Sequence, residues 1–210
     1  NMNLSLKNIN KKFDNTMVLK DISLDLQDKK SIVIIGPSGG GKSTLLNILA
    51  GYIEFDSGVA AINEHYLKNN EKFLREYRKK VGIVFQAYNL FPHLTALRNI
   101  TLILEKVHSY SKKDANDKAV RLLKQFQLED HKDKKPIQLS GGQQQRLAIV
   151  RALSYDPEIL FFDEPSAALD PALTSEVLEV IKELKDKNRD MIIVTHEMGF
   201  ARQVADYILF

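Results

Sequence analysis

A glycine-rich stretch with a lysine and a hydroxyl side chain at fixed spacing is the clearest chemical feature of the sequence. Residues 32–44 read IVIIGPSGGGKST, in which Gly36, Gly41, Lys42 and Ser43 satisfy the spacing G-x-x-x-x-G-K-[ST]. Glycines let backbone N–H groups turn inward around phosphate oxygens, the lysine reaches β- and γ-phosphate oxygens, and the serine hydroxyl suits Mg²⁺. The stretch therefore predicts a phosphate-binding loop.

Carboxylates and a histidine follow two other apolar runs. Asp163 and Glu164 come directly after ILFF, and His196 comes directly after MIIVT. One carboxylate could hold Mg²⁺ together with Ser43 while the other polarises an attacking water. A lone histidine after a strand is commonly structural, but here several strands deliver polar groups to one sheet edge, which favours a functional role for His196.

Three further sites have two interpretations when only the residues are considered. Phe13 lies beside the turn residues Asp14-Asn15, where simple packing is the favoured interpretation. Gln86 ends the apolar run VGIVFQ and could be an ordinary glutamine at a strand edge. The segment 140–143, SGGQ, opens a helix and could offer N–H groups and a hydroxyl to an anion, or it could be a plain N-cap.

The elements that must position these residues indicate an α/β fold. Four consecutive β-branched residues at 32–35 suit a strand covered on both faces, and the apolar spacing after the loop suits a helix that ends at Gly51. Similar strands are expected at 81–86, 159–162, 191–195 and 207–210. Apolar and polar residues alternate at 2–9 and 18–26, which is typical of half-buried strands in an antiparallel sheet, and Asp56-Ser57-Gly58 predicts a turn.

The middle third of the chain changes character. Glycine is absent between Ile83 and Leu139, and Ser111 to Asp114 has the spacing of a capping box ahead of a one-sided apolar stripe. These features predict a helical insertion that ends at Pro136. A further helix is expected to begin with Asp170 as N-cap and Pro171 as first helical residue and to run to about Lys187.

Composition limits the possible classes of protein. The chain has 210 residues, 44% of them hydrophobic, which is enough for one compact domain with a sizeable core. Its net charge of +3 is too mild to favour nucleic acid as the main partner. The sequence has no cysteine, which excludes disulfides and thiolate metal sites. No apolar run of membrane-spanning length and no charged-then-apolar leader is present, so we expect neither a membrane span nor a secretory signal.

Taken together, the motifs resemble those of a known family. GPSGGGKST, Gln86, LSGGQ, ILFFDE and His196, in this order, resemble the nucleotide-binding subunit of ATP-binding cassette (ABC) transporters, and they run from about position 13 to 196. LSGGQ is highly specific to that family. The longer strings NLFPHLT, LSGGQQQR and VTHEMGFAR resemble the branch that serves bacterial uptake of polar amino acids.

The resemblance implies a fold and a division of the chain. The expected fold is a P-loop NTPase core with a parallel sheet, an antiparallel β subdomain and an inserted helical subdomain. We expect a single ABC ATPase domain over 1–210, with the catalytic core and β subdomain at about 1–88 and 156–210. The helical subdomain, which carries LSGGQ, is expected at about 89–155. Members of the family usually continue past the strand expected at 207–210, so a further C-terminal segment is also implied.

The resemblance also implies roles for individual residues, with ATP and Mg²⁺ as cofactors. Glu164 resembles the general base and Asp163 the magnesium ligand, while Phe13 resembles the aromatic residue that stacks on adenine. The implied catalytic residues are Glu164, His196, Gln86 and Lys42, and the implied magnesium site is Ser43, Gln86 and Asp163. The implied nucleotide-binding residues are Phe13, Val18, Ser38, Gly39, Gly40, Gly41, Lys42, Ser43, Thr44, Ser140, Gly141, Gly142, Gln143 and Asp170.

Two positions depart from the family pattern. Gly40 stands where serine is usual, and little consequence is expected because the consensus glycines and lysine are intact. Ala167 stands where serine is common, which puts in doubt one hydrogen bond across the expected dimer.

The implied assembly is a head-to-tail homodimer in which Ser140 to Gln143 of one chain face the ATP of the other. The implied partners are transmembrane permease subunits at the cytoplasmic face of the membrane and, indirectly, an extracellular or periplasmic amino-acid-binding protein, with no nucleic acid. The alternative is an ABC ATPase of another membrane system, for lipoprotein release or cell division. A DNA-repair ABC ATPase would carry a long coiled-coil insertion, whereas only about 100 residues separate Lys42 from Leu139.

Overall fold

A five-stranded parallel sheet forms the centre of the computed structural model, which describes residues 1–167 and 169–210. The strand order is β6-β7-β8-β3-β9. The strands span Val81–Val84 (β6), Ile159–Asp163 (β7), Asp190–Thr195 (β8), Ser31–Ile35 (β3) and Tyr207–Leu209 (β9). Each expected apolar run is therefore a strand of this sheet, although β6 stops two residues before Gln86.

The register of this sheet brings three strand ends together. Ile35 pairs with Thr195, and Asp163 pairs with Val194, so β3, β7 and β8 end at nearly the same level. The interior of each strand is buried because both faces of the sheet are covered, which explains the continuous apolar runs. Polar residues that follow these strands consequently meet at one edge.

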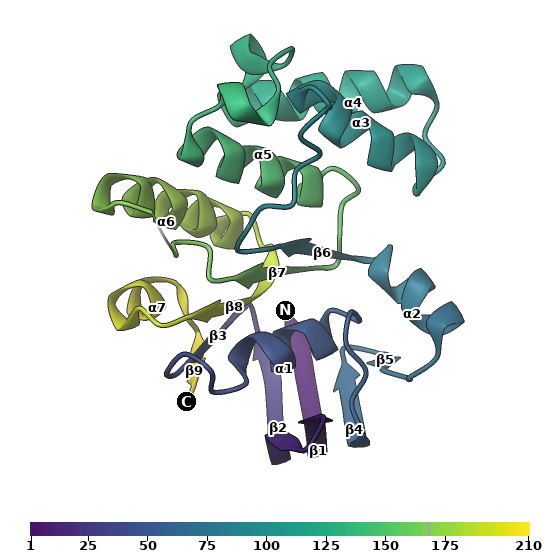
Figure 1. Cartoon of the computed structure of the whole chain (residues 1–210), viewed down its shortest axis with the longest axis vertical. Coiled ribbons are helices and arrows are strands. Elements are labelled where there is room, and N and C mark those ends of the chain that lie inside the picture. The colour runs from purple at the N-terminus through teal and green to yellow at the C-terminus, as the bar shows by residue number, and fades with distance from the viewer. Residues whose placement is uncertain (168) are drawn as a thin grey trace.

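A second, antiparallel sheet has the strand order β2-β1-β4-β5. Its strands span Met2–Phe13 (β1), Thr16–Lys29 (β2), Ser57–Ile62 (β4) and His65–Tyr66 (β5). Figure 1 shows helix α1, Lys42–Leu49, beside this sheet, and one apolar cluster joins α1 to both sheets. The predicted turn at Asp56-Ser57-Gly58 is wrong in part, because Ser57 and Gly58 already belong to β4, where Ser57 pairs with Asn10. Phe13 is the last residue of β1 rather than a turn residue.

Helices gather on the other face of the parallel sheet (Figure 1). These helices are α3 (Ala96–Lys106), α4 (Lys112–Gln125), α5 (Gly141–Leu153), α6 (Pro171–Asp186) and α7 (Met198–Val204), with 3₁₀ turns η1 (Glu129–His131) and η2 (Pro136–Gln138). Helix α2 (Glu71–Arg78) instead packs through Phe73 and Tyr77 against the cluster that contains α1. The predicted N-caps Ser111, Ser140 and Asp170 each accept a backbone hydrogen bond from the first turn of their helix. The expected fold class is confirmed.

In the part of the chain that the structure describes, every helix is too short or too polar to cross a bilayer.

Candidate active site

The loop between β3 and α1 is shaped by glycines that adopt left-handed backbone angles. Gly39 and Gly41 have φ values of 79° and 84°, and Gly41 is the N-cap residue of α1. A side chain at position 41 would also meet Leu19 at 2.9 Å and the Val18 carbonyl at 3.0 Å. Glycine is required there for both reasons. The loop therefore presents its N–H groups and the positive end of α1 to the same space.

Lys42 lies folded back over this loop. Its ammonium group donates to the carbonyl oxygens of Gly36 at 2.6 Å and Pro37 at 3.0 Å, and it lies 3.8 Å from the Glu164 carboxylate. Only 8% of the Lys42 side chain is exposed. A buried ammonium held by two carbonyls and one carboxylate is a fixed positive charge, which is what a phosphate-binding loop needs.

Ser43 and Asp163 face each other across the gap between α1 and β7. The Ser43 hydroxyl donates to Asp163 Oδ1 at 2.8 Å. Burial raises the pKa of the Asp163 carboxyl above its usual value, the Ser43 hydrogen bond and the Lys42 charge oppose that rise, and the Glu164 charge adds to it. An accessible pair of oxygen ligands of this kind fits a hard cation such as Mg²⁺.

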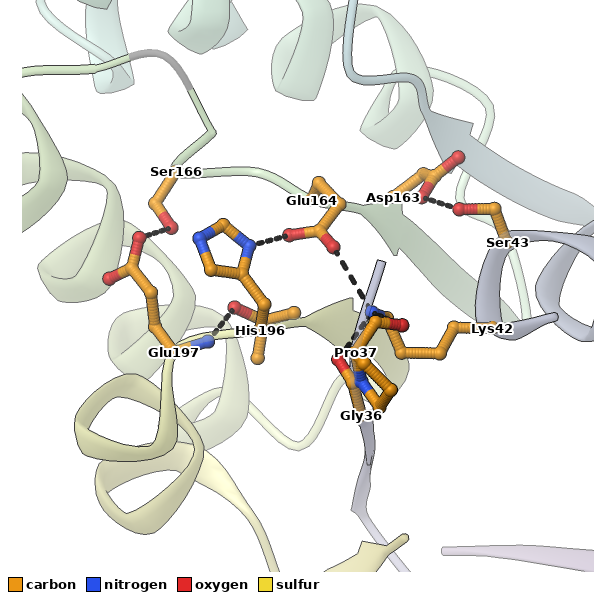
Figure 2. A network of polar contacts seen from close by, with 10 residues as sticks. Gly36, Pro37, Lys42, Ser43, Asp163, Glu164, Ser166, His196 and Glu197 are labelled. Atoms are coloured by element: carbon orange, nitrogen blue, oxygen red, sulfur yellow. Dashed lines mark hydrogen bonds and ion pairs between the residues drawn. The ribbon is translucent and has the colours of Figure 1, made fainter. Parts of the chain in front are cut away.

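Glu164 has an uncommon backbone conformation. Its φ is 48°, in the left-handed region, and its N–H donates to the Val194 carbonyl at 2.9 Å. This twist turns Glu164 away from the Ser43 side of β7, so its carboxylate reaches Lys42 and also accepts from His196 Nδ1 at 3.0 Å. Figure 2 shows the Glu164 carboxylate between these two groups and the Asp163 carboxylate directed toward Ser43.

The same loops carry a second contact that the sequence analysis missed. The Ser166 hydroxyl donates to Glu197 Oε1 at 2.9 Å, and the Glu197 N–H donates to the Thr195 hydroxyl at 3.1 Å (Figure 2). Ser166 and Glu197 lie within two residues of Glu164 and His196. Both are polar residues that closely follow neighbouring parallel strands, and this position in the sequence is the signal by which they could have been identified.

Most of the expected nucleotide-binding residues line one cavity of about 290 Å³. Its walls are Val18, Ser38, Gly39, Gly40, Gly41, Lys42, Ser43, Thr44, Gln86 and Glu164. Gln86 lies in an exposed turn after β6. Phe13 is not among the lining residues; it is 42% exposed, with the Lys11 ammonium 4.9 Å from its ring centre. An exposed aromatic ring is available for stacking.

The segment from Ser140 to Gln143, which we call the signature segment, is also outside this cavity. It forms a complete capping box: the Gln143 N–H donates to the Ser140 hydroxyl at 3.2 Å, and the Ser140 N–H donates to Gln143 Oε1 at 3.0 Å. Asp170, the N-cap residue of α6, is exposed and accepts from the Leu173 N–H at 3.0 Å. The chain therefore has two separate surfaces suited to phosphate, the loop cavity and the exposed start of α5.

Comparison with known proteins identifies the family. The sequence profile described as "ABC transporter" matches residues 19–167. The glutamate transport ATP-binding protein GluA of Corynebacterium efficiens is 44% identical over 207 residues, which cover 99% of this chain and 86% of GluA. The glutamate/aspartate import protein GltL of Escherichia coli is 44% identical and the glutamine transport protein GlnQ of Bacillus subtilis 43%, with the same coverage.

Solved structures agree with this comparison. A bacterial ABC transporter cassette in dimeric form is 35% identical, with a TM-score of 0.83 over 96% of this chain and 91% of that chain. A dimeric post-hydrolysis state of the same cassette, bound to ADP and Pi, has a TM-score of 0.82 at the same identity and coverage. Both matches cover nearly the whole chain. The chain therefore belongs to the ABC transporter family and is one of its ATP-hydrolysing cassettes.

Proposed function

We propose that this chain is the ATP-hydrolysing subunit of an importer for a polar amino acid. The observation that carries the chemistry is the meeting of Lys42, Glu164 and His196 at one edge of the parallel sheet, beside the Ser43–Asp163 pair. The cargo class rests on the relatives at 43–44% identity, which are named for glutamate, aspartate and glutamine transport.

The proposed reaction is attack of water on the γ-phosphate of ATP. Loop N–H groups and Lys42 hold the phosphates, and Phe13 stacks on adenine. Glu164 orients the water and accepts its proton, and His196 contacts the γ-phosphate. Glu164 touches both Lys42 and His196, so the base and the phosphate-binding cations are pre-organised as one unit.

Mg²⁺ would be held by Ser43 and Asp163, with Gln86 as a further ligand. When bound, it would neutralise charge on the phosphate oxygens. Among the described residues, no group of three or more histidine, cysteine or acidic side chains is arranged to hold a metal ion. Magnesium is usually bound by one or two protein groups together with substrate phosphates and water.

The second half of each site would come from a partner copy. The signature segment opens a helix of 13 residues, and its exposed Ser140 hydroxyl and N–H groups suit a γ-phosphate. Because this segment lies outside its own chain's cavity, a head-to-tail pair would place it over the cavity of the other chain. Asp170 would lie at the same interface. Loss of the γ-phosphate would then remove the bridge between the two chains.

Coupling to transport would pass through the helical subdomain at about 89–155, which we propose moves as a unit relative to the core at about 1–88 and 156–210. A groove of about 360 Å³ lies where these parts meet. Its lining includes Tyr52, Phe85, Arg78, Arg151 and Tyr155. An aromatic and cationic groove next to Gln86 would suit a short cytoplasmic segment of a transmembrane permease. The chain would thus act at the cytoplasmic membrane face, with an amino-acid-binding protein on the other side.

Light scattering of the Glu164→Gln variant tests this proposal. The variant should bind ATP but lose most turnover, so Mg²⁺-ATP should trap the dimer and raise the mass from 23.9 kDa to about double. Nucleotide binding without any mass change would argue against a site shared between copies of this chain. Hydrolysis at the wild-type rate would refute Glu164 as the base.

The cargo class requires a separate experiment. Cross-linking in membranes followed by identification of the bound permease should recover an amino-acid permease, and ATPase activity of that complex should rise with the cognate binding protein and its amino acid. Recovery of a lipoprotein-release or cell-division membrane protein would overturn the importer assignment and leave the ATPase assignment intact.

A further inference from the structure

The dipeptide Pro165-Ser166 is held from two sides by polar side chains, Gln145 and Glu197. On one side, Gln145 of α5 is fully buried, and its Nε2 donates to the Pro165 carbonyl at 2.7 Å. The other amide atom, Oε1, has no hydrogen-bond partner among the described residues. The bond to Pro165 is therefore the contact that fixes the orientation of this amide.

On the other side, Ser166 is 2% exposed and donates its hydroxyl proton to the Glu197 carboxylate at 2.9 Å. Glu197 is the N-cap residue of α7, yet within the described chain its carboxylate binds Ser166 rather than an amide of its own helix. A hydrogen bond to a charged acceptor in a buried position is among the stronger kinds. The Glu197 carboxylate therefore connects the start of α7 to the loop after β7.

These bonds flank the Glu164–His196 contact. Glu164 and Ser166 are two residues apart, His196 and Glu197 are adjacent, and each member of the first pair binds one member of the second (Figure 2). The loops after β7 and β8 are therefore joined by two parallel cross-links. Proline at position 165 has a fixed φ, which restricts backbone rotation between these contacts.

We propose that Gln145 and Ser166 are positioning residues that link the start of α5 to the His196–Glu164 pair of the same chain. The inference rests on the proposed head-to-tail dimer. In that dimer the signature segment of α5 serves the partner's ATP, whereas His196 and Glu164 serve the chain's own ATP. The path from Gln145 through Pro165, Ser166 and Glu197 then couples the two ATP sites that one chain contributes to.

The test measures ATP hydrolysis by the full chain at increasing ATP concentration. Ser166→Ala should lower kcat roughly tenfold, because small displacements of catalytic groups are costly. Its Hill coefficient should fall from about 2 toward about 1, since two coupled sites would become independent. Affinity for a fluorescent ATP analogue, measured without turnover, should stay unchanged. Gln145→Met, which keeps the side-chain volume but removes the donor, should have the same effects.

Two further variants separate positioning from stability. Ser154→Ala removes another fully buried serine hydroxyl, which donates to the Arg151 carbonyl at 2.7 Å at the far end of α5. It should lose a similar amount of stability in urea unfolding with kcat and the Hill coefficient unchanged. Ser166→Thr retains the hydroxyl and should restore both quantities. If Ser166→Ala matches Ser154→Ala in every readout, the proposed linkage is wrong.

Failure of this inference can be told apart from failure of the proposed function. Mg²⁺-ATP should trap the Glu164→Gln dimer whether or not Ser166 is altered. If Mg²⁺-ATP does not trap the dimer of the Glu164→Gln variant with Ser166 intact, the proposal of a composite site is refuted. If trapping succeeds and ATP hydrolysis by Ser166→Ala keeps its Hill coefficient, only the proposed linkage through Pro165-Ser166 is refuted.

Discussion

At the scale of single residues, the charge arrangement around Glu164 determines how the site works. Its carboxylate lies between the Lys42 ammonium and the His196 ring, with only 12% of the side chain exposed. A carboxylate held between two cationic or hydrogen-bonding groups is oriented without needing water to solvate it. The left-handed backbone at Glu164 is the local strain that makes this orientation possible.

Lys42→Ala should weaken ATP binding at least roughly tenfold, because it removes a charge-assisted contact to phosphate. Titration with a fluorescent ATP analogue measures the change. Lys7→Ala, which removes the same charge from an exposed position on β1, is the matched control and should bind ATP like the unaltered chain. Equal affinity in Lys42→Ala and Lys7→Ala would contradict the assignment of the phosphate-binding loop.

At the scale of elements, the strands of the parallel sheet could be predicted because each is a continuous apolar run followed by the polar group it positions. Helices α2 and α3 were not predicted individually, because their short, mixed sequences also depend on polar contacts with neighbouring loops. Asn99, for example, is fully buried in α3 and bonds the backbone of Phe91, eight positions earlier, in both directions. Such contacts of polar side chains are not visible in the apolar periodicity of a sequence.

The same limit applies within the site. The loop from Gly36 to Thr44, the acidic pair and His196 could be predicted because their chemistry depends on spacing along the chain. Ser166 and Glu197 could not, because their contact joins residues 31 positions apart and neither belongs to a motif of its own. The role expected for the signature segment rests on its resemblance to a family motif, and the structure adds that this segment lies outside the cavity of its own chain.

The close approach of β6 to the end of α5 gives a prediction at this scale. A Cβ atom at Gly82 would meet Leu160 Cδ2 at 2.9 Å and the Ala152 carbonyl oxygen at 3.0 Å. Gly82→Ala should therefore lower the free energy of unfolding by about 1–3 kcal/mol, as overpacking does elsewhere. Urea unfolding followed by circular dichroism measures the change.

Gly199→Ala is the matched control, because Gly199 lies inside α7 and an added Cβ there would have no neighbour within 4 Å among the described residues. Alanine is the better helix former, so this variant should gain about 0.5–1 kcal/mol. If both variants shift stability in the same direction, the tight contact between β6 and α5 would not exist in solution.

At the scale of the whole molecule, the proposed head-to-tail dimer would complete two phosphate sites, each of which is incomplete on a single chain. The loop cavity supplies Lys42 and Glu164, His196 contacts Glu164, and the exposed start of α5 supplies Ser140 and its N–H groups. A two-fold axis makes both sites equivalent, so the same mutation affects both in a homodimer. In a mixed dimer of two different variants, however, one site contains both altered residues and the other site contains neither.

Mixing two inactive variants should therefore restore hydrolysis. Glu164→Gln lacks the base, and Ser140→Asp keeps an N-cap for α5 but sets a carboxylate against the γ-phosphate. Half of the dimers in an equal mixture are mixed, and each has one intact site, so activity should recover to about a quarter of the wild-type value if the sites act independently. A steady-state phosphate-release assay of each variant alone and of the mixture measures it. Recovery below that value would report the cooperativity proposed for Gln145 and Ser166, whereas no recovery at all would mean that each chain completes its own site.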